Sequence, residues 1–182
     1  MSIRLYKLLG IPFLLFAIYL ALPLSKPLFP DDYSTVVADA DGQILRVFLN
    51  QRQQWHLPPR ADLTIPAKLE RAVLCFEDRR FLSHPGIDPL ALARAVWQTL
   101  SSGRVVSGAS TLTMQVTRLA QPKPRTLTNK LLEMGKALRV ELRYTKEEIL
   151  RLYLDHAPYG GNIVGYQGAA LRYFGKSPDQ LT

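Results

Sequence analysis

The sequence predicts a mainly α domain that follows an N-terminal transmembrane helix and a short β-hairpin. Residues 8–24 form an uncharged apolar run. Alternating and β-branched residues then flank the turn "DADG", and Asp-Gly is a strong hairpin signal. From Pro66 onward, apolar residues recur with helical spacing between recognisable helix starts. The chain is therefore divided into an anchor at 1–24, a linker and β-hairpin at 25–60, and a helical domain at 61–182.

The N-terminal apolar run predicts a membrane anchor. A helix over residues 8–24 reaches roughly 25 Å at about 1.5 Å per residue, which is near the lower limit for spanning a bilayer. Arg4 and Lys7 precede the run, so the N-terminus is expected in the cytoplasm and the rest of the chain across the membrane. The alternative is a cleaved secretory signal. No small-x-small cleavage site follows the run, which favours an uncleaved anchor.

Composition restricts the partners and the chemistry. The chain has 182 residues and a formal net charge of +8, which favours an anionic partner such as nucleic acid, anionic lipid or a phosphorylated substrate. The exported topology argues against nucleic acid. Cys75 is the single cysteine, so neither an intrachain disulfide nor a thiolate zinc cluster is expected. The histidines are scattered, and the sequence has no P-loop or dinucleotide fingerprint, so we expect no organic cofactor.

Helices are predicted by their start signals as well as by their periodicity. Asp88-Pro89 reads as an N-cap followed by a first-turn proline, and Thr145 to Glu148 reads as a capping box. The predicted helices cover residues 66–82, 89–101, 111–119, 126–143, 146–155 and 163–174.

Glu77 is the first candidate for chemistry. Three of its four neighbours one helical turn away are apolar or aromatic, and the fourth is Arg80. A carboxylate beside an apolar face loses solvation, which would raise its pKa, although Arg80 would oppose this. Such a group suits general base catalysis. The alternative is an ordinary Glu77–Arg80 ion pair at a helix end. Asp78 lies about 100° around the helix and is expected to brace the structure.

The predicted helix at 126–143 carries a second candidate group. Arg125, Asn129 and Glu133 are spaced by one helical turn each, with Lys130 beside them and an apolar stripe on another face. Arg125 and Lys130 could bind a phosphate, and Glu133 could then act as an acid or as a metal ligand. A solvated charged helix face explains the same pattern.

The segment "GRVVSGASTLTMQVTRL" predicts a loop that leads into a helix. Ser110 or Thr111 would cap that helix, and backbone donors there could hold an anionic or sugar substrate. A plain capped turn is equally compatible.

Five segments in this order resemble the five sequence blocks of the peptidoglycan glycosyltransferase domain: "EDRRFLSHPG", "GASTLTMQ", "RTLTNKLLE", "KEEILRLYL" and "GYQGAALRYFGK". The resemblance runs from about Pro66 to the last residues. The segment "VVSGASTLTMQVTRL" is most similar to the C subgroup of class A penicillin-binding proteins. In that family the domain continues through further helices and into a transpeptidase domain, so the resemblance implies a domain that is C-terminally incomplete at Thr182.

The resemblance implies an all-α, lysozyme-like fold and a polymerase of lipid II in the bacterial inner membrane, with the catalytic domain on the periplasmic side. A lipid-diphosphate sugar chain would be transferred to another lipid II with inversion. By position in the first block, Glu77 would be the general base for the acceptor's 4-hydroxyl. By position in the third block, Glu133 would assist departure of the lipid diphosphate, directly or through Mg²⁺ or Mn²⁺.

The substrate-binding residues expected from the loop and from the resemblance are Asp78, Ser110, Thr111, Gln115, Arg118, Arg125 and Lys130. Two positions depart from the family's usual pattern, because Met114 replaces a glutamine and Asn129 replaces an arginine. The expected partners are lipid II, the growing glycan strand, membrane lipids and other cell-wall synthesis proteins. Two alternatives stay open: a lysozyme-like enzyme that cleaves glycan, and a non-catalytic membrane-tethered scaffold that binds lipid II.

Overall fold

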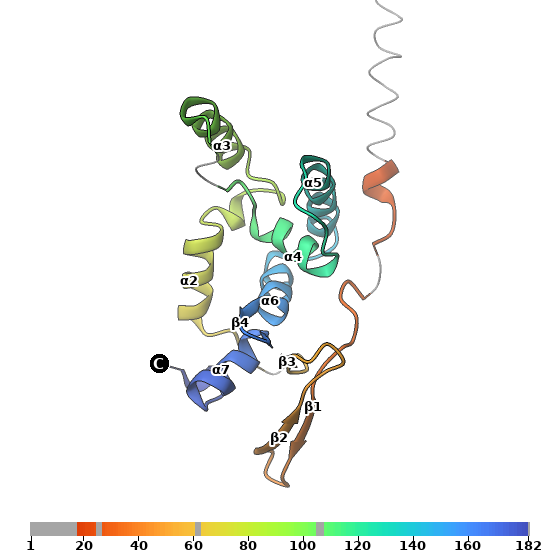
Figure 1. Ribbon diagram of the computed structural model, residues 1–182, viewed down its shortest axis with the longest axis vertical. Helices are drawn as coiled ribbons and strands as arrows, with labels where there is room; N and C mark the ends of the chain where they lie inside the picture. Colours follow the sequence, from red (N-terminus) through yellow and green to blue (C-terminus); the bar gives the residue numbers. More distant parts are fainter. Residues whose placement is uncertain (1–17, 25–26, 61–62, 105–107, 182) are drawn as a thin grey trace, which may run out of the picture.

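The computed structural model describes residues 18–24, 27–60, 63–104 and 108–181, and within them the chain is mainly α, as predicted (Figure 1). The helices are α2 (Ala67–Glu77), α3 (Pro89–Ser102), α4 (Leu112–Ala120), α5 (Leu127–Glu141), α6 (Lys146–His156) and α7 (Tyr166–Phe174), with 3-10 turns η1 (Phe81–Ser83) and η2 (Pro178–Gln180). The strands are β1 (Thr35–Ala38), β2 (Ile44–Phe48), β3 (Trp55–His56), β4 (Pro158–Gly160) and β5 (Ile163–Val164).

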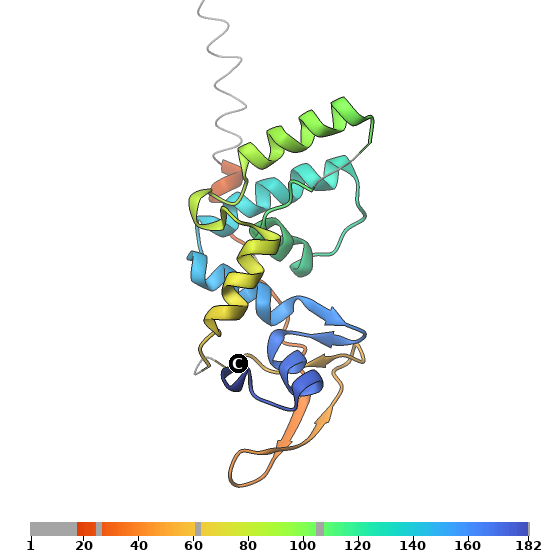
Figure 2. The ribbon, with the colours of Figure 1, turned by 90° about the vertical axis from the view of Figure 1, so that its left-hand side faces the viewer.

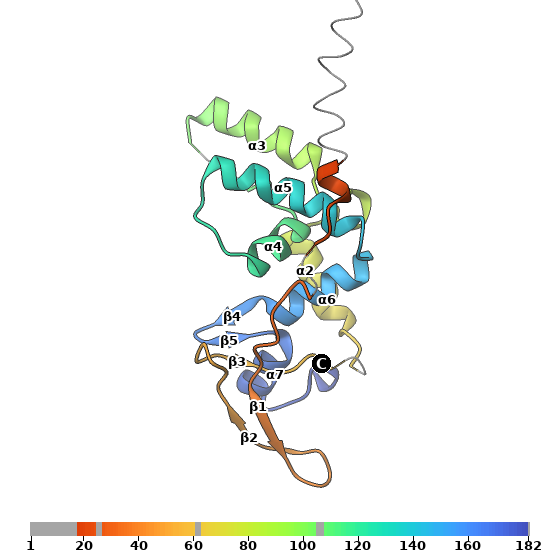
Figure 3. The same cartoon turned by 90° about the vertical axis from the view of Figure 1, so that its right-hand side faces the viewer.

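The elements are stacked along the long axis of the molecule. Helices α3 and α5 lie at the end that carries residues 18–21, and the β1–β2 hairpin projects from the opposite end (Figures 1 and 2). Helix α6 lies between these ends, α4 is on its side toward α3 and α5, and α2 overlaps α6 along the long axis (Figures 1 and 3). Of the two helices at the end near residues 18–21, α5 carries the predicted site residues Lys130 and Glu133.

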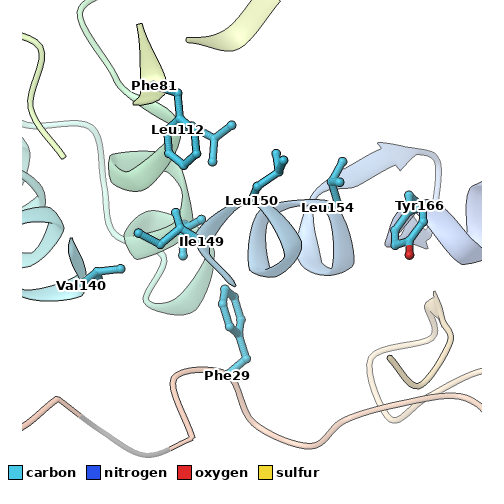
Figure 4. Packing of buried hydrophobic residues seen from close by; sticks show 9 residues of the cluster. Phe29, Phe81, Leu112, Val140, Ile149, Leu150, Leu154 and Tyr166 are labelled. Carbon is cyan, nitrogen blue, oxygen red and sulfur yellow. The ribbon is translucent and has the colours of Figure 1, made fainter. Parts of the chain in front are cut away.

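The hydrophobic core is built around α6. Ile149 and Leu154 are fully buried, and they cluster with Leu112 and Val116 of α4 and with Val140 of α5 (Figure 4). Burying side chains of this size stabilises the fold by roughly 2 kcal/mol each. One face of α4 is thus fixed against the core, which orients the residues on its other face.

The predicted hairpin is confirmed. Strands β1 and β2 pair antiparallel, with Thr35 opposite Phe48. The carboxylate of Asp39 accepts hydrogen bonds from the backbone N–H groups of Asp41 (3.0 Å) and Gln43 (2.7 Å), and Gly42 has a φ of +79°. An aspartate that bonds backbone amides two and four residues ahead is typical of a tight turn.

A three-stranded sheet with the order β3-β5-β4 was not predicted. Strand β3 pairs parallel to β5, and β4 pairs antiparallel to it. The helix expected at 163–174 begins only at Tyr166, because Ile163 and Val164 belong to β5 and Gly165 has a φ of +84°. A Cβ at Gly165 would lie 2.7 Å from the carbonyl oxygen of Asp155, so this crossing of two backbones needs glycine.

Most of the predicted anchor at 1–24 lies outside the described residues. Within the described part of the chain, no helix has both the length and the apolar character needed to cross a membrane. Residues 18–21 form a helical turn that packs on α5. The buried guanidinium of Arg139 donates to the carbonyl oxygens of Leu22 (2.8 Å) and Pro23 (2.7 Å) and lies 4.9 Å from the ring centroid of Tyr19.

Candidate active site

Glu77 is the last residue of α2, and the chain turns sharply after it. Its side chain is exposed, and Oε2 accepts a hydrogen bond of 2.7 Å from Nε2 of Gln115 on α4. The burial that we expected to desolvate this carboxylate is therefore absent. The bond joins two residues that the sequence patterns place in separate helices, and it fixes one carboxylate oxygen at the edge of α4.

The predicted helix at 66–82 ends instead at Glu77, because Asp78 is bound elsewhere. Asp78 is buried, and each of its carboxylate oxygens lies 3.0 Å from Nε2 of His84, while one also accepts from the backbone N–H of Leu112 at 2.9 Å. His84 Nδ1 accepts from the N–H of Gly86 at 3.2 Å, so the donating proton of the ring is on Nε2. Asp78 therefore braces the site, as its helical position indicated. That it also binds substrate stays a prediction.

Arg80 pairs with Asp88 rather than with Glu77. The guanidinium donates from Nε to Oδ2 at 2.9 Å and from Nη2 to Oδ1 at 2.8 Å. Asp88 also caps α3, as predicted, by accepting from the N–H of Ala91 at 2.9 Å. Burial raises the pKa of Asp88, but the bonds from Ala91 and Arg80 outweigh it and hold the pKa below its ordinary value. The ordinary Glu77–Arg80 ion pair considered above is thus replaced by a bidentate pair.

A cleft of about 840 Å³ brings most of the predicted site residues together. Its walls come from the end of α2, the start of the segment that enters α4, α4 itself and the first half of α5. The predicted residues that line it are Glu77, Ser110, Gln115, Arg118, Arg125, Lys130 and Glu133. Two carboxylates and three cations thus face one space.

Lys130 is half-buried beside this cleft, and its Nζ donates to Oγ of Ser110. Burial lowers its pKa, Arg118 and Arg125 lower it further, and Glu133 opposes the shift. The cations are close enough to repel one another, so an anion that enters the cleft would relieve this repulsion.

Thr111 does not line that cleft. Its hydroxyl donates to the carbonyl oxygen of Gly86 at 2.6 Å and accepts from the N–H of Met114 at 3.2 Å, which makes it the N-cap of α4. The buried N–H of Leu112 is already bound by Asp78. The Thr111 hydroxyl and the N–H of Leu112 are therefore already bound within the chain. A substrate contact of Thr111 stays a prediction.

A family model described as Transglycosylase matches residues 41–182. The chain belongs to the Transglycosylase family. Three penicillin-binding proteins are similar to this chain. The chain is 44% identical over 156 residues to penicillin-binding protein 1C of Escherichia coli, which covers 86% of this chain and 20% of that protein.

Penicillin-binding protein 1A of Escherichia coli is 40% identical over 147 residues, covering 80% of this chain and 17% of that protein. Penicillin-binding protein 1A of Haemophilus influenzae is 38% identical over 145 residues, covering 79% of this chain and 16% of that protein. This Transglycosylase chain therefore spans about a fifth or less of the length of these relatives.

On the α5 side of the Transglycosylase cleft, Glu133 is the one described carboxylate that could bind a divalent metal ion. The described residues contain no group of three or more histidine, cysteine, aspartate or glutamate side chains that could hold a metal. Glu133 shares this side with the cations of Arg125 and Lys130. Mg²⁺ is commonly bound by one or two carboxylates together with substrate phosphates, so Glu133 fits such an ion only when phosphate oxygens complete the coordination.

Tyr153 of α6 is influenced by two charged groups of the site, which the sequence did not suggest. Burial raises the pKa of its phenol, the nearby charge of Glu77 adds to the rise, and Arg118 opposes it. No spacing pattern could have indicated it, because α6 meets the site only through tertiary packing.

Proposed function

We propose that this Transglycosylase chain polymerises lipid II into β-1,4-linked glycan strands by inverting transfer from a lipid-diphosphate donor. The observation that carries the proposal is the single cleft in which Glu77 and Glu133 face the cations of Arg118, Arg125 and Lys130. A diphosphate leaving group gains negative charge as its bond breaks, and several positioned cations stabilise that charge.

Glu77 acts as the general base in this proposal. Its free carboxylate oxygen takes the proton from the 4-hydroxyl of the acceptor's N-acetylglucosamine, while the bond from Gln115 holds the other oxygen in place. The acceptor oxygen forms a bond to C1 of the donor sugar as the bond from C1 to the lipid diphosphate breaks. Direct displacement converts the α-linked diphosphate into a β-linked product.

The three cations bind and orient the departing diphosphate. Arg118 and Arg125 can each donate two parallel hydrogen bonds to phosphate oxygens, whereas Lys130 acts as a compact charge held toward the cleft by Ser110. Glu133 would hold a divalent ion when one is present, and such an ion supplies additional neutralisation of the phosphate charge. We place the reaction at the outer face of the bacterial inner membrane, because both substrates carry lipid chains.

The test is conversion of labelled lipid II by the detergent-solubilised chain with Mg²⁺, resolved on a gel. Native protein should give a ladder of polymer, and Glu77→Gln should abolish it. Glu147→Gln, which changes an exposed carboxylate of α6 outside the site, serves as the matched control and should retain the ladder. A ladder that persists in Glu77→Gln would remove this residue as the base. Shortening of a preformed glycan would favour a cleaving enzyme, and binding of lipid II without any product would favour a scaffold.

A further inference from the structure

Two histidines that do not line the cleft of Glu77 join separate parts of the chain. His56 belongs to β3, and His156 is the last residue of α6. Their ring centroids are 5.2 Å apart, and the ring of Phe29 stacks on His156 at 3.6 Å. Phe29 is buried and points from the segment 27–34 toward α6 (Figure 4). That segment lies between residues 18–24 and the β1–β2 hairpin, so these rings fasten the connection to α6.

Both ring nitrogens of His56 face backbone carbonyl oxygens. Nδ1 lies 3.2 Å from the oxygen of Asp32, and Nε2 lies 3.1 Å from the oxygen of Asp155. A neutral imidazole has one N–H and can donate to only one of them, whereas an imidazolium donates to both. Burial lowers the pKa of His56 and Arg52 adds to this, but the two carbonyls and the charge of Asp32 oppose it. A proton on His56 therefore has hydrogen-bond partners in place.

His156 differs, because only one of its ring nitrogens has a partner. Nδ1 donates to the carbonyl oxygen of Leu152 at 2.9 Å. Nε2 is buried, and no group in the described part of the chain forms a hydrogen bond with it. Burial and the neighbouring His56 lower the pKa of His156 to about 4, although the bond to Leu152 opposes the shift. A proton on Nε2 would be a buried donor without an acceptor.

The charged groups around the two histidines have other partners. Asp32 pairs with Arg52, with 3.2 Å between the carboxylate and Nε. The carboxyl group of Asp155 is hydrogen-bonded to Gln167 of α7 and interacts with Arg151 of α6. Only the backbone carbonyl of Asp155 contacts His56. The charge of a protonated His156 would therefore stay uncompensated in its present position.

A cavity of about 260 Å³ adjoins both rings and Phe29. Its walls from α4, β4 and β5 are apolar and consist of Leu119, Ala120, Pro158 and Val164. Asp32 and Arg52 also line it and make part of its wall polar. Tyr33, whose ring centroid lies 4.8 Å from that of His56, is a neutral phenol because burial raises its pKa. The cavity gives a charged His156 ring room to move toward polar groups and water.

We infer that protonation of His156 is an acid-sensitive release that detaches the segment 27–34 from α6. The first proton that the pair takes up stays on His56, between two carbonyl oxygens. The second proton enters His156, whose ring then turns toward the polar part of the cavity and loses its stack on Phe29. The segment before the hairpin is therefore held against α6 by fewer contacts in acid than at neutral pH.

Hydrogen exchange of the detergent-solubilised chain measures this release. The Ser34 amide donates to the carbonyl oxygen of His56 at 2.7 Å, and the His56 amide donates to Oγ of Ser34 at 3.0 Å. Since folding lowers the pKa of His156, its contribution to stability is present above the ordinary pKa and is lost as pH falls. Between pH 7 and pH 5, protection of both amides, corrected for intrinsic rates, should fall about twentyfold or more. The Ile149 amide, bound to Thr145 at the start of α6, should keep its protection.

His156→Phe keeps a flat ring beside Phe29 but cannot take up a proton. In this variant the fall in protection should shrink to the smaller part that His56 contributes. Asp155 titrates in both proteins, so the comparison removes its effect. NMR titration of the native imidazoles gives a result even if the variant fails to fold, because His156 must take up its proton in the pH range where Ser34 loses protection.

Three outcomes overturn the inference. Protection of Ser34 in the native chain could stay unchanged between pH 7 and pH 5. It could fall equally in the native chain and in His156→Phe, which would assign the release to another group. Ile149 could lose protection together with Ser34, which would mean that the whole domain unfolds in acid.

Discussion

Replacing Asp78 by asparagine should destabilise the fold strongly although the two side chains have nearly the same shape. Two buried donors converge on this carboxylate, the Nε2–H of His84 and the backbone N–H of Leu112. An asparagine offers one oxygen, so its NH₂ group must face one of the donors. His84 cannot turn its proton away, because Nδ1 already accepts from Gly86.

The expected cost follows from these bonds. Loss of one charge-assisted hydrogen bond costs about 1.5–3 kcal/mol, and a buried donor without a partner costs about 1–3 kcal/mol. Removal of a buried charge offsets part of this, so we expect the free energy of unfolding to fall by about 2–4 kcal/mol.

Urea unfolding followed by circular dichroism measures this change. Asp41→Asn, at the exposed tip of the β1–β2 hairpin, is the matched control and should remain within about 0.5 kcal/mol of the native value. If Asp78→Asn also stays within 0.5 kcal/mol, the bracing role of Asp78 is refuted.

Three further predictions concern parts of the chain outside the proposed chemistry. Burial raises the pKa of Asp155 to about 6, so its ionisation opposes folding, and native stability falls relative to Asp155→Asn as pH rises from about 4 to 7. The difference in unfolding free energy should grow by up to roughly 3 kcal/mol over that range, and a flat difference would contradict the assignment. Gly86→Ala should lower the unfolding free energy by about 3 kcal/mol, because a Cβ would lie 3.0 Å from a backbone oxygen of α5 at a φ of +88°. Gly42→Ala, with a similar φ in open space, should cost only about 1 kcal/mol, and equal losses would show that the contact is unimportant. Arg139→Met should release residues 18–24 from α5, so limited proteolysis there should accelerate, whereas an unchanged cleavage rate would mean that its bonds to backbone carbonyls do not hold the segment.

Helix starts could be predicted from the sequence because their signals are local. The cap formed by Asp88 and the capping box from Thr145 to Glu148 are both confirmed, and each joins residues only three positions apart. The end of α2 could not be predicted, since Asp78 leaves the helix to bind a backbone amide 34 residues away. The short strands β3, β4 and β5 likewise depend on pairing between distant segments, and strands of two or three residues carry no periodic pattern.

The candidate site was predicted best where its residues share a helix. Lys130 and Glu133 line the same cleft, as their spacing on one helix indicated. Asn129 was expected on the same charged face, but its side-chain amide donates to the carbonyl oxygen of Pro124 at 2.9 Å. The partnership of Glu77 with Gln115 spans 38 residues, so no local pattern could reveal which oxygen is held and which is free.

The hydrogen bonds of Asp78 also determine whether α2 can unfold locally. Glu77 is adjacent to a carboxylate bound to the first amide of α4, and Leu112 is fully buried in the same core that contains α6. The end of α2 cannot fray without breaking a contact to that core. The Leu112 amide should therefore exchange its hydrogen only when the core itself unfolds. The position of Glu77 and the stability of the core are therefore lost in one cooperative step, and partial unfolding of α2 is not a route by which Glu77 would leave the site while the core remains folded.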